Sequence, residues 1–493
     1  MRKSTLRASS VPPGSRTAAP HSIRAVLFYY ALFAGLVLLG VVYGVFAATR
    51  FAGVGSGGLW GNLLGLLKLS WLVPMPYVIL NTLAFMRYPV VIRPSIPPSV
   101  PQPGVRLYFR FVTRGRNEAL SRESAEDARQ VLEAILPPDN WRIEVVSDSF
   151  MALDSEDGQV QLIQVPEDYR PPRNARFKAR ALHYALSASD ATDEDWIIHL
   201  DEETRFDGDT VRDIAHFVAG EAQRPLAQRR LGQGVVLYGR RRIVNWLTTL
   251  ADSLRVGDDY GRFRLQYERG VAPFGMHGSF VVVNNGVERA VGFDHGFAGS
   301  ITEDTYFALV LQARGYRFAF LPSSMYEESP FTFADFVRQR RRWYGGLWLV
   351  ARAGELPIRV RAVLIGFMLA WTFSWLSLLT SFLNLIAPTP TPLWLGLLGG
   401  ATLAAYLGLY LVGFGMTFRG RLPRGEQLKR LVLQVVLLPV FSFMEACGVL
   451  YGLVSPPKDF YVVRKSAQVV AADGTITGLS HSETQAEVGR FPI

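Results

Sequence analysis

Residues 196–204 read Trp-Ile-Ile-His-Leu-Asp-Glu-Glu-Thr, an apolar run that stops at three consecutive acidic residues. A short apolar run that ends in polar residues is typical of a buried strand. Because side chains two apart at a strand end point the same way, we expect Asp201 and Glu203 to lie together at a sheet rim. Two such carboxylates can hold a hard divalent cation, Mg²⁺ or Mn²⁺. Solvated turn residues are the commoner explanation of an isolated acidic pair.

Strand and helix patterns alternate around this stretch. Strands are predicted at 105–113, 142–147 and 196–200, and helices at 121–135 and 176–187, with Ser121 preferred over Ser124 as the cap of the first helix. This alternation predicts an open α/β sheet with helices on both faces. In such sheets ligands bind outside the carboxyl ends of the strands.

Further acidic residues follow other parts of the predicted domain. Asp148 follows the strand 142–147, and Glu303 and Asp304 follow the glycine-rich stretch 296–300. Asp304 can act as a general base toward an acceptor hydroxyl. It can equally be a helix cap, with Thr302 as another candidate for that role.

Apolar segments flank this domain on both sides. The chain of 493 residues is 49% hydrophobic and only 19% charged, and the excess lies in five segments, each long enough for the roughly 20 residues that a spanning helix needs. They are 25–48, 59–85, 363–386, 393–416 and 431–454. The first follows a basic stretch but is too long for a cleaved signal, so it is predicted to be an anchor. The single cysteine, Cys447, excludes a disulfide framework.

The distribution of basic residues predicts the topology. The loop 417–430 carries Arg419, Arg421, Arg424, Lys429 and Arg430, so this loop, the N-terminus and the central domain are predicted to be cytoplasmic. Five spans would place the C-terminus outside, yet Lys458, Arg464 and Lys465 follow the last segment. Either that segment is re-entrant or interfacial, or the tail is an exception.

The predicted plan of this multi-pass membrane protein is therefore a basic N-terminus (1–24), two spanning helices (25–91), the α/β domain (92–330), an amphipathic interface helix (331–356), about three spanning or interfacial helices (357–454) and a tail (455–493).

A basic and aromatic cluster precedes the third apolar segment. Residues 339–343 read Gln-Arg-Arg-Arg-Trp within an amphipathic stretch suited to the membrane interface. Arg342 can pair with a diphosphate and Trp343 can stack on a sugar, or the cluster is simply a basic flank. Lys178 also has two interpretations: it contacts a phosphate, or it lies on a solvated helix face. His277 is a ligand or a polar lining residue, and His199 is interpreted as a core residue.

These motifs in their order resemble the signature series of family 2 glycosyltransferases with the GT-A fold, a Rossmann-like nucleotide-diphospho-sugar transferase fold. The resemblance implies that Asp148 contacts the nucleotide, Asp201 and Glu203 bind the metal, and Asp304 is the catalytic base. It places Gln339, Arg342 and Trp343 at the membrane interface. One departure is that the metal motif reads Asp-Glu-Glu here, which puts the exact role of Glu203 in doubt.

Five stretches look like the egghead-type β-1,4-mannosyltransferases of animals: 196–204 (WIIHLDEET), 232–240 (GQGVVLYGR), 299–306 (GSITEDTY), 328–343 (ESPFTFADFVRQRRRW) and 455–465 (SPPKDFYVVRK). This resemblance implies GDP-mannose as donor, a glycolipid acceptor, inversion at the anomeric carbon and a divalent metal. The donor-binding set that we predict is Asp148, Lys178, Glu202, Arg114 and Glu118. The acceptor and interface set is Glu303, Gln339, Arg342, Trp343, His277, Gly278 and Ser279.

Two other functions stay open at this point. A processive polysaccharide synthase that uses a UDP-sugar shares the motif around Trp343. A transporter or membrane scaffold is the non-enzymatic alternative, although Lys68 and Glu445 are the only ionisable residues within the predicted spans. The net charge of +10 does not indicate nucleic-acid binding, because the basic residues cluster at membrane flanks rather than on one soluble face.

Overall fold

The computed structural model describes residues 23–51, 58–90, 96–101, 104–151, 153, 157–240, 242–387, 389 and 391–461. Its α/β domain is built on a seven-stranded sheet of order β3-β2-β1-β4-β6-β5-β7. Only β6 runs antiparallel to its neighbours in this sheet. The strands are β1 (Leu107–Thr113), β2 (Trp141–Ser147), β3 (Val160–Gln164), β4 (Trp196–Asp201), β5 (Leu231–Tyr238), β6 (Val281–Asn284) and β7 (Phe318–Glu327).

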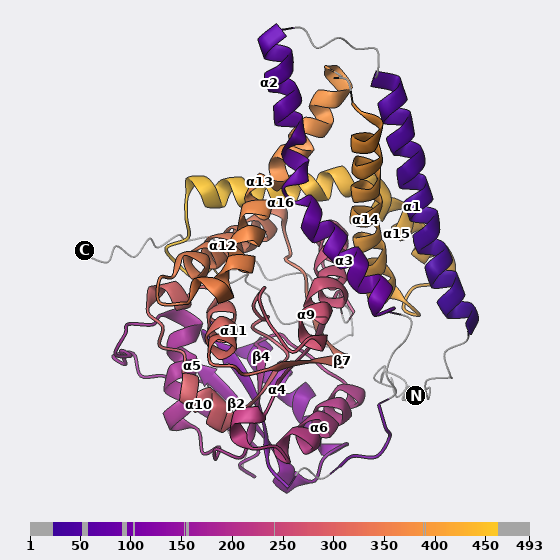
Figure 1. The fold of residues 1–493 in the computed structure, drawn as a ribbon. Coiled ribbons are helices and arrows are strands. Elements are labelled where there is room, and N and C mark those ends of the chain that lie inside the picture. Colours follow the sequence, from indigo (N-terminus) through magenta and orange to yellow (C-terminus); the bar gives the residue numbers. More distant parts are fainter. Residues whose placement is uncertain are drawn as a thin grey trace, which may run out of the picture.

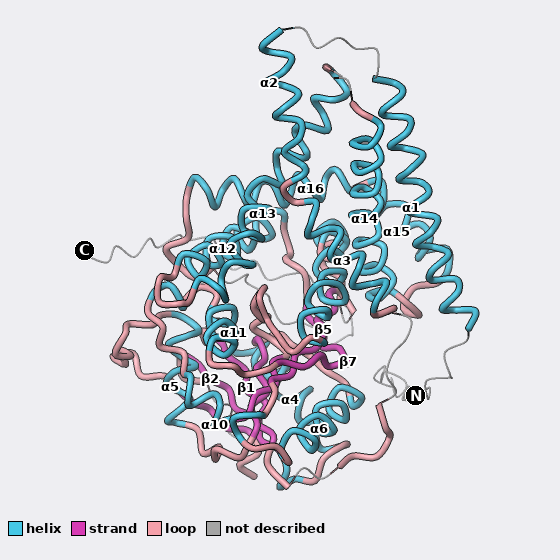
Figure 2. Tube along the Cα trace, in the orientation of Figure 1, coloured by secondary structure: helices cyan, strands magenta, loops and turns pink. Residues whose placement is uncertain are grey.

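Helices cover both faces of the sheet, as predicted (Figure 2). On β1, Phe109 and Phe111 belong to one buried core, whereas Tyr108 and Val112 belong to the other. This alternation is the two-residue period of a strand buried on both faces. One face carries α4 (Glu118–Glu133) and α6 (Gly208–Ala222), and the other carries α5 (Phe177–Ala188), α10 (Asn285–Val291) and α11 (Glu303–Ala313).

The start of α4 corrects one prediction. Asn117, not Ser121, caps this helix, because the Asn117 Oδ1 atom accepts a hydrogen bond from the backbone N–H of Leu120 at 3.2 Å. Ser121 and Ser124 lie inside the helix and donate to the carbonyl oxygens four residues earlier. A serine inside a helix can also bond to the carbonyl oxygen four residues earlier, so a serine alone does not mark the start of a helix.

A bundle of long apolar helices stands on the α/β domain (Figure 1). In the described residues, four helices are long and apolar enough to cross a membrane, within the ranges Tyr29–Thr49, Gly58–Arg87, Ile358–Asn384 and Leu393–Phe418. Three of these spans are the single helices α1 (Ile23–Phe51), α13 (Ile358–Ile386) and α14 (Leu393–Phe418). The span Gly58–Arg87 contains two helices, α2 (Gly58–Lys68) and α3 (Met75–Arg87). Lys68 is buried at the end of α2 and donates to the carbonyl oxygen of Ala387.

The fifth predicted segment is not one straight helix. It is split into α15 (Arg424–Val436) and α16 (Leu438–Val454), which are bent by 56° at their junction. Pro439 lies in the first turn of α16, a position that proline favours because the missing N–H is not needed there. In Figure 1, α16 crosses the bundle instead of running along it. This geometry favours the re-entrant or interfacial alternative for the segment.

Two helices join the bundle to the α/β domain. The predicted amphipathic stretch is α12 (Phe333–Arg352), which packs against α13 and α16. The short α8 (Ser253–Asp258) packs against α14 at glycine contacts, and a Cβ added at Gly413 would lie 1.8 Å from the Ser253 carbonyl oxygen. Between α8 and α9 (Arg264–Glu268), a π-helical turn at Asp259–Phe263 contains the non-helical Gly261. The sheet domain and the bundle are therefore in close backbone contact.

The remaining short elements are α7 (Trp246–Ala251) and the single turns Leu69–Leu72, Pro138–Asn140, Leu226–Gln228 and Phe297–Gly299.

Candidate active site

A cavity of about 430 Å³ connects the sheet rim with the membrane helices. At the sheet end it is lined by Asp148, which follows β2, and by Asp201, at the end of β4. At the other end it is lined by aromatic residues of the bundle, among them Tyr77, Trp371 and Tyr406. Carboxylates far apart in the sequence, including Asp201 and Asp304, thus share one cavity that reaches the membrane helices.

The turn after β4 holds the acidic triplet in place. The Thr204 hydroxyl accepts from the Asp201 backbone N–H at 3.1 Å and bonds to the Ser279 hydroxyl at 2.8 Å. Glu202 accepts a hydrogen bond from the Thr113 hydroxyl on β1 at 2.5 Å. Asp201, Glu202, Glu203 and Ser279 all line the cavity, and the buried Ser279 also supports the turn through its bond to Thr204.

Lys178, in the first turn of α5, connects two carboxylates of the cavity. Its Nζ atom lies 2.5 Å from Asp201 Oδ1, 3.7 Å from Glu303 Oε1 and 3.0 Å from the carbonyl oxygen of Gly278. Burial lowers the pKa of Lys178, but the two carboxylates outweigh burial and the net pKa is raised. Lys178 is therefore a fixed cation inside the site, not a solvated helix residue.

Asp304 is the second residue of α11 and lies partly buried among charged groups. Burial raises its pKa, while the backbone N–H of Thr305, which donates to Asp304 Oδ1 at 2.6 Å, and the charge of Lys178 act in the opposite direction. Burial also raises the pKa of the adjacent Glu303, to about 7. A carboxyl with a raised pKa is suited to accept a proton near neutral pH.

The alternative reading of Asp304 as a helix cap is wrong. The helix begins at Glu303 and Thr302 occupies the cap position, but the Thr302 side chain makes no capping bond. Its Oγ1 atom is buried without a hydrogen-bond partner in the described part of the chain.

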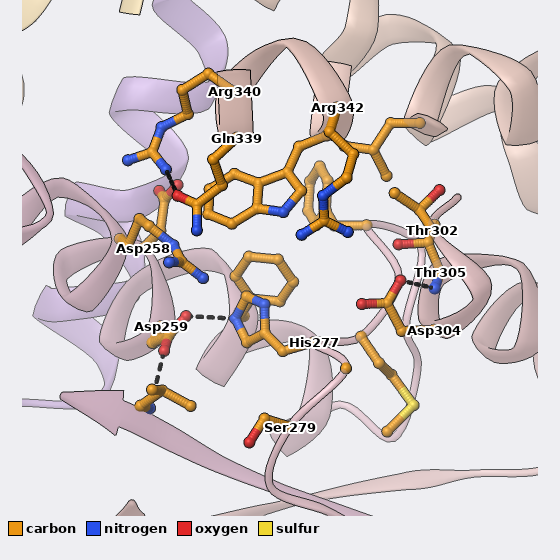
Figure 3. Close-up of a pocket in the computed structure, with 18 of the residues that line it drawn as sticks. Asp258, Asp259, His277, Ser279, Thr302, Asp304, Thr305, Gln339, Arg340 and Arg342 are labelled. Carbon is orange, nitrogen blue, oxygen red and sulfur yellow. Dashed lines mark hydrogen bonds and ion pairs between the residues drawn. The ribbon is translucent and has the colours of Figure 1, made fainter. Parts of the chain in front are cut away.

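The cluster on α12 faces the same cavity (Figure 3). Arg342 is partly buried beside Glu303, Asp201 and Asp304, and loss of solvent lowers the pKa of its guanidinium despite these carboxylates. The Trp343 ring lies 4.1 Å from the guanidinium carbon of Arg255 and 4.5 Å from that of Arg340. Two guanidinium groups this close to its ring hold the indole through cation–π contacts.

Sequence reasoning missed Arg340, although it lies beside Arg342. The Arg340 side chain is 2% exposed and forms ion pairs with Asp252 at 2.6 Å and Glu445 at 2.7 Å. It also donates to the Gln339 side-chain oxygen at 2.9 Å. Arg340 thus joins α12 to α16 and to the residue that precedes α8. The sequence contains both acidic partners, Asp252 and Glu445, but nothing in it indicates that they meet Arg340.

Two of the predicted donor residues have partners beside the cavity. Asp148 pairs with Arg180 at 2.7 Å. Arg114 donates to the carbonyl oxygen of Phe460, whose ring lies 4.2 Å from the guanidinium carbon of Arg342. Phe460 and the neighbouring Tyr461 line the cavity as well, so the segment that follows α16 forms part of its wall.

Glu118 is the predicted donor residue that the structure places elsewhere. It lies in the first turn of α4, is exposed, and pairs with Arg122 at 2.6 Å. It is absent from the cavity lining. Its side chain stabilises the helix through an i,i+4 ion pair, so the structure gives no support for a donor contact.

The two histidines singled out in the sequence have different surroundings. His199 is buried in the sheet, as predicted, and its Nε2 atom lies 2.8 Å from Glu288 Oε2. Its Nδ1 atom has no hydrogen-bond partner among the described residues, so only one ring nitrogen is satisfied. His277 lines the cavity, and its Nε2 atom lies 2.6 Å from Asp259 Oδ1. Asp259 and Asp258 were not predicted, because the turn that presents them is π-helical and has no sequence period of its own.

The residues at the end of β4 fit a divalent cation that is shared with a substrate. No group of three or more His, Cys, Asp or Glu side chains in the described ranges is arranged to hold a metal alone. Mg²⁺ is, however, often held by one or two carboxylates together with the phosphates of a substrate. Asp201 and Glu203 supply two carboxylates to the cavity.

Comparison with known proteins agrees with this geometry. The family model "Glycosyl transferase family group 2" matches residues 196–414. The β-1,4-mannosyltransferase egh of Drosophila melanogaster is 35% identical over 419 residues, which cover 83% of this chain and 88% of that protein. The chain belongs to the family 2 glycosyltransferases.

Other relatives and a solved structure extend the comparison for this glycosyltransferase. The β-1,4-mannosyltransferases bre-3 of Caenorhabditis briggsae and Caenorhabditis elegans are 34% and 33% identical, over 85% and 84% of this chain and 91% and 90% of their own lengths. The crystal structure of S. aureus TarS 1–349 in complex with UDP aligns with a TM-score of 0.32 at 9% identity, over 71% of this chain and 89% of that chain. The seven-stranded α/β domain and the apolar helices that flank it have the architecture predicted for a GT-A-type membrane glycosyltransferase.

Proposed function

We propose that this glycosyltransferase transfers mannose from GDP-mannose, in β linkage, onto a hydroxyl of a lipid-anchored sugar. The observation that carries the proposal is the continuous cavity, which has acidic residues at the sheet rim and aromatic residues of the bundle at its other end. The identity to three β-1,4-mannosyltransferases supports the choice of sugar and linkage.

The donor is assigned to the sheet end of the cavity. Asp201 and Glu203 would hold Mg²⁺ or Mn²⁺, which would neutralise charge on the leaving diphosphate when bound. Asp148 and Arg114 line the cavity near the ends of β2 and β1 and are assigned to the nucleotide. Lys178 and Arg342 bring two partly buried cations beside these carboxylates, where they can neutralise phosphate oxygens.

Asp304 is assigned as the general base. As the acceptor oxygen attacks the anomeric carbon, its proton passes to the Asp304 carboxylate, and the bond between the anomeric carbon and the phosphate oxygen breaks. GDP leaves with the electron pair of that bond, and the single displacement inverts the anomeric centre. Positioning of the two substrates and charge neutralisation supply most of the rate.

The acceptor is assigned to the membrane end. Tyr77, Trp371 and Tyr406 can hold the apolar part of a lipid while its sugar reaches Asp304. In Figure 1, α1 begins and α14 ends at the side of the bundle that meets the α/β domain. With the basic residues that follow α14, this arrangement supports a multi-pass protein whose catalytic domain is cytoplasmic.

A radiolabelled transfer assay tests the proposal. The purified protein is offered GDP-mannose or UDP-sugars, with extracted membrane lipids as acceptors, in Mg²⁺, Mn²⁺ or EDTA. We expect one mannose per lipid from GDP-mannose alone, and loss of transfer in EDTA. A polymer made from a UDP-sugar would instead establish a processive synthase.

Matched variants separate specific from general effects in this assay. Asp201→Asn is expected to abolish transfer, because it removes a carboxylate assigned to the cation. Asp209→Asn is the control, because Asp209 is an exposed residue of α6 that lies outside the cavity lining and pairs with the nearby Arg212. Equal loss of transfer in both variants would contradict the assignment.

A further inference from the structure

The cavity contains a second pair of polar side chains, opposite the charged group around Asp304. His277 Nε2 lies 2.6 Å from Asp259 Oδ1. Because an ionised carboxylate only accepts hydrogen bonds, this nitrogen must be the donor. The other ring nitrogen, Nδ1, has no hydrogen-bond partner among the residues that the structure describes. The imidazole thus keeps one nitrogen for a ligand.

Contacts with Asp259 and Phe263 hold this imidazole in one orientation. Asp259 is itself fixed, because its second oxygen accepts from the backbone N–H of Val236 on β5 at 3.2 Å. The Phe263 ring packs against the imidazole with ring centroids 4.4 Å apart. The side chain of Asp259 is 5% exposed and that of His277 is 21% exposed, so the histidine is the member of the pair that reaches the cavity. A carboxylate that orients a histidine in this way selects the ring nitrogen that faces a substrate.

The backbone at Asp259 departs from a regular helix. Asp259–Phe263 forms a π-helical turn, and Gly261 within it has φ −91° and ψ −113°. A side-chain Cβ at Gly261 would lie 2.1 Å from the Asn81 Oδ1 atom of α3, so the turn also packs closely on a membrane helix. Single π-helical turns of this kind occur frequently at functional sites. This turn points Asp259 toward His277, while Asp258 bonds to Asn81 at 2.9 Å instead.

The position of the pair in the cavity indicates its ligand. In Figure 3, His277 lies between Asp259 and Asp304. Both His277 and Asp304 line the cavity, and the charge of His277 is one of the influences that lower the pKa of Asp304. The same cavity is lined by the aromatic residues assigned to the lipid and by the carboxylates assigned to the cation. A polar group across the cavity from the base can meet the sugar of the acceptor.

We propose that His277, oriented by Asp259, binds a hydroxyl of the acceptor sugar other than the one that attacks, and so selects which sugar is glycosylated. The inference rests on the proposed function, because it needs an acceptor that presents a sugar at this place. His277 is then a substrate contact and Asp259 is a positioning residue. Neither takes the proton that Asp304 receives.

The test uses octyl β-glucoside and its monodeoxy analogues as acceptors of mannose from GDP-mannose, with the full-length protein in detergent. In the wild type, one analogue that keeps the attacking hydroxyl should lose about 10-fold in kcat/KM, because His277 is left without its partner. In His277→Ala, that analogue and the parent glucoside should be used equally well, since the contact is already absent. Asp259→Asn should give a partial loss of the same discrimination.

Three controls separate this role from a structural one. The KM for GDP-mannose should stay unchanged in His277→Ala and in the milder His277→Gln, while the KM for octyl β-glucoside rises about 10-fold. His216→Ala removes a histidine of α6 that bonds to the Ser99 carbonyl oxygen and should alter neither value. Stabilisation by GDP in a thermal melt checks that each variant is folded.

The outcomes are distinct for the two proposals. Wild-type protein that transfers no mannose to any sugar acceptor contradicts the proposed function, and the subsite with it. Wild-type protein that transfers mannose, combined with His277 variants that keep the full discrimination among deoxy analogues, overturns the subsite alone. An equal rise of both KM values in the His277 variants overturns it too, since that pattern belongs to a general distortion of the site.

Discussion

At the residue scale, the position of Asp304 and Lys178 in the cavity depends on the small space that Gly278 leaves beside them. A Cβ added at Gly278 would lie 3.2 Å from both Asp304 Oδ2 and Lys178 Nζ. Glycine is thus the residue that lets the base and the cation approach the same backbone segment.

We therefore expect Gly278→Ala to lower kcat about 10- to 100-fold, because displacement of reacting groups by less than 1 Å carries costs of this order. Steady-state kinetics with saturating donor is the measurement. Gly220→Ala on α6 is the matched control, since a Cβ at Gly220 meets nothing within 4 Å. Unchanged kcat in Gly278→Ala would show that the space beside Asp304 is not used.

The pH dependence is a second prediction at this scale. Burial raises the pKa of Asp304, and it raises that of Glu303 to about 7. The two adjacent carboxyls titrate as a pair and the base must be ionised to act, so activity should rise with pH through about 7, the value to which the pKa of Glu303 is raised. In Glu303→Gln the acid limb should shift to lower pH, because the carboxyl whose pKa burial and the Asp304 charge raise to about 7 is removed. A profile of kcat/KM from pH 5 to pH 9 checks both statements, and the absence of any acid limb above pH 5 would contradict the first.

Sequence reasoning at this scale found most of the cavity residues because family motifs mark them. Asp148, Asp201, Asp304, Arg342 and Trp343 all line one cavity. It failed for Glu118, whose partner is its neighbour Arg122. It also failed for Asp259 and Arg340, because their roles depend on contacts with residues far away in the sequence.

At the element scale, close backbone packing holds the membrane helices together. A Cβ at Gly400 of α14 would lie 1.8 Å from the Gly40 carbonyl oxygen of α1, and one at Gly44 would lie 2.4 Å from the Gly396 carbonyl oxygen. Pairs of glycines four residues apart allow such helix contacts in membranes.

Gly400→Ala should separate α1 from α14 and lower stability by about 1–3 kcal/mol. Thermal unfolding in detergent, followed by intrinsic fluorescence, is the measurement. Gly415→Ala lies on the same helix with nothing within 4 Å of the added Cβ, so it should leave the midpoint unchanged. Equal midpoints for the two variants would contradict this account of the packing.

Element positions were largely predictable and junctions were not. Apolar length revealed the long helices α1, α13 and α14, and short apolar runs revealed β1, β2 and β4. The break between α15 and α16 was missed because a window of hydrophobic residues does not reveal a bend of 56°.

At the scale of the whole molecule, a buried ion-pair group links the catalytic domain to the helices. Arg340 of α12 pairs with Asp252, before α8, and with Glu445 of α16. Asp252 is fully buried, so loss of the arginine leaves a carboxylate without its partner charge in the interior.

Arg340→Met should therefore destabilise the protein by about 3–5 kcal/mol and reduce transfer through the loss of the Trp343 contact. Arg338→Met is the matched control. It removes an arginine of the same helix whose side chain is 50% exposed, and should lower the stability by less than about 1 kcal/mol. Thermal melts and transfer assays on both variants decide the point. Similar stability of the two would show that Arg340 does not join the parts.

The central claim is that Asp201 and Asp304 serve one donor and one acceptor in a single cavity. The most direct measurement compares mannose transfer with Mn²⁺-dependent stabilisation by GDP in a thermal melt, for wild type and Asp304→Asn. The account predicts that Asp304→Asn loses transfer at least about 100-fold and keeps the GDP stabilisation of the wild type. Full turnover in Asp304→Asn, or loss of GDP stabilisation together with transfer, would contradict it.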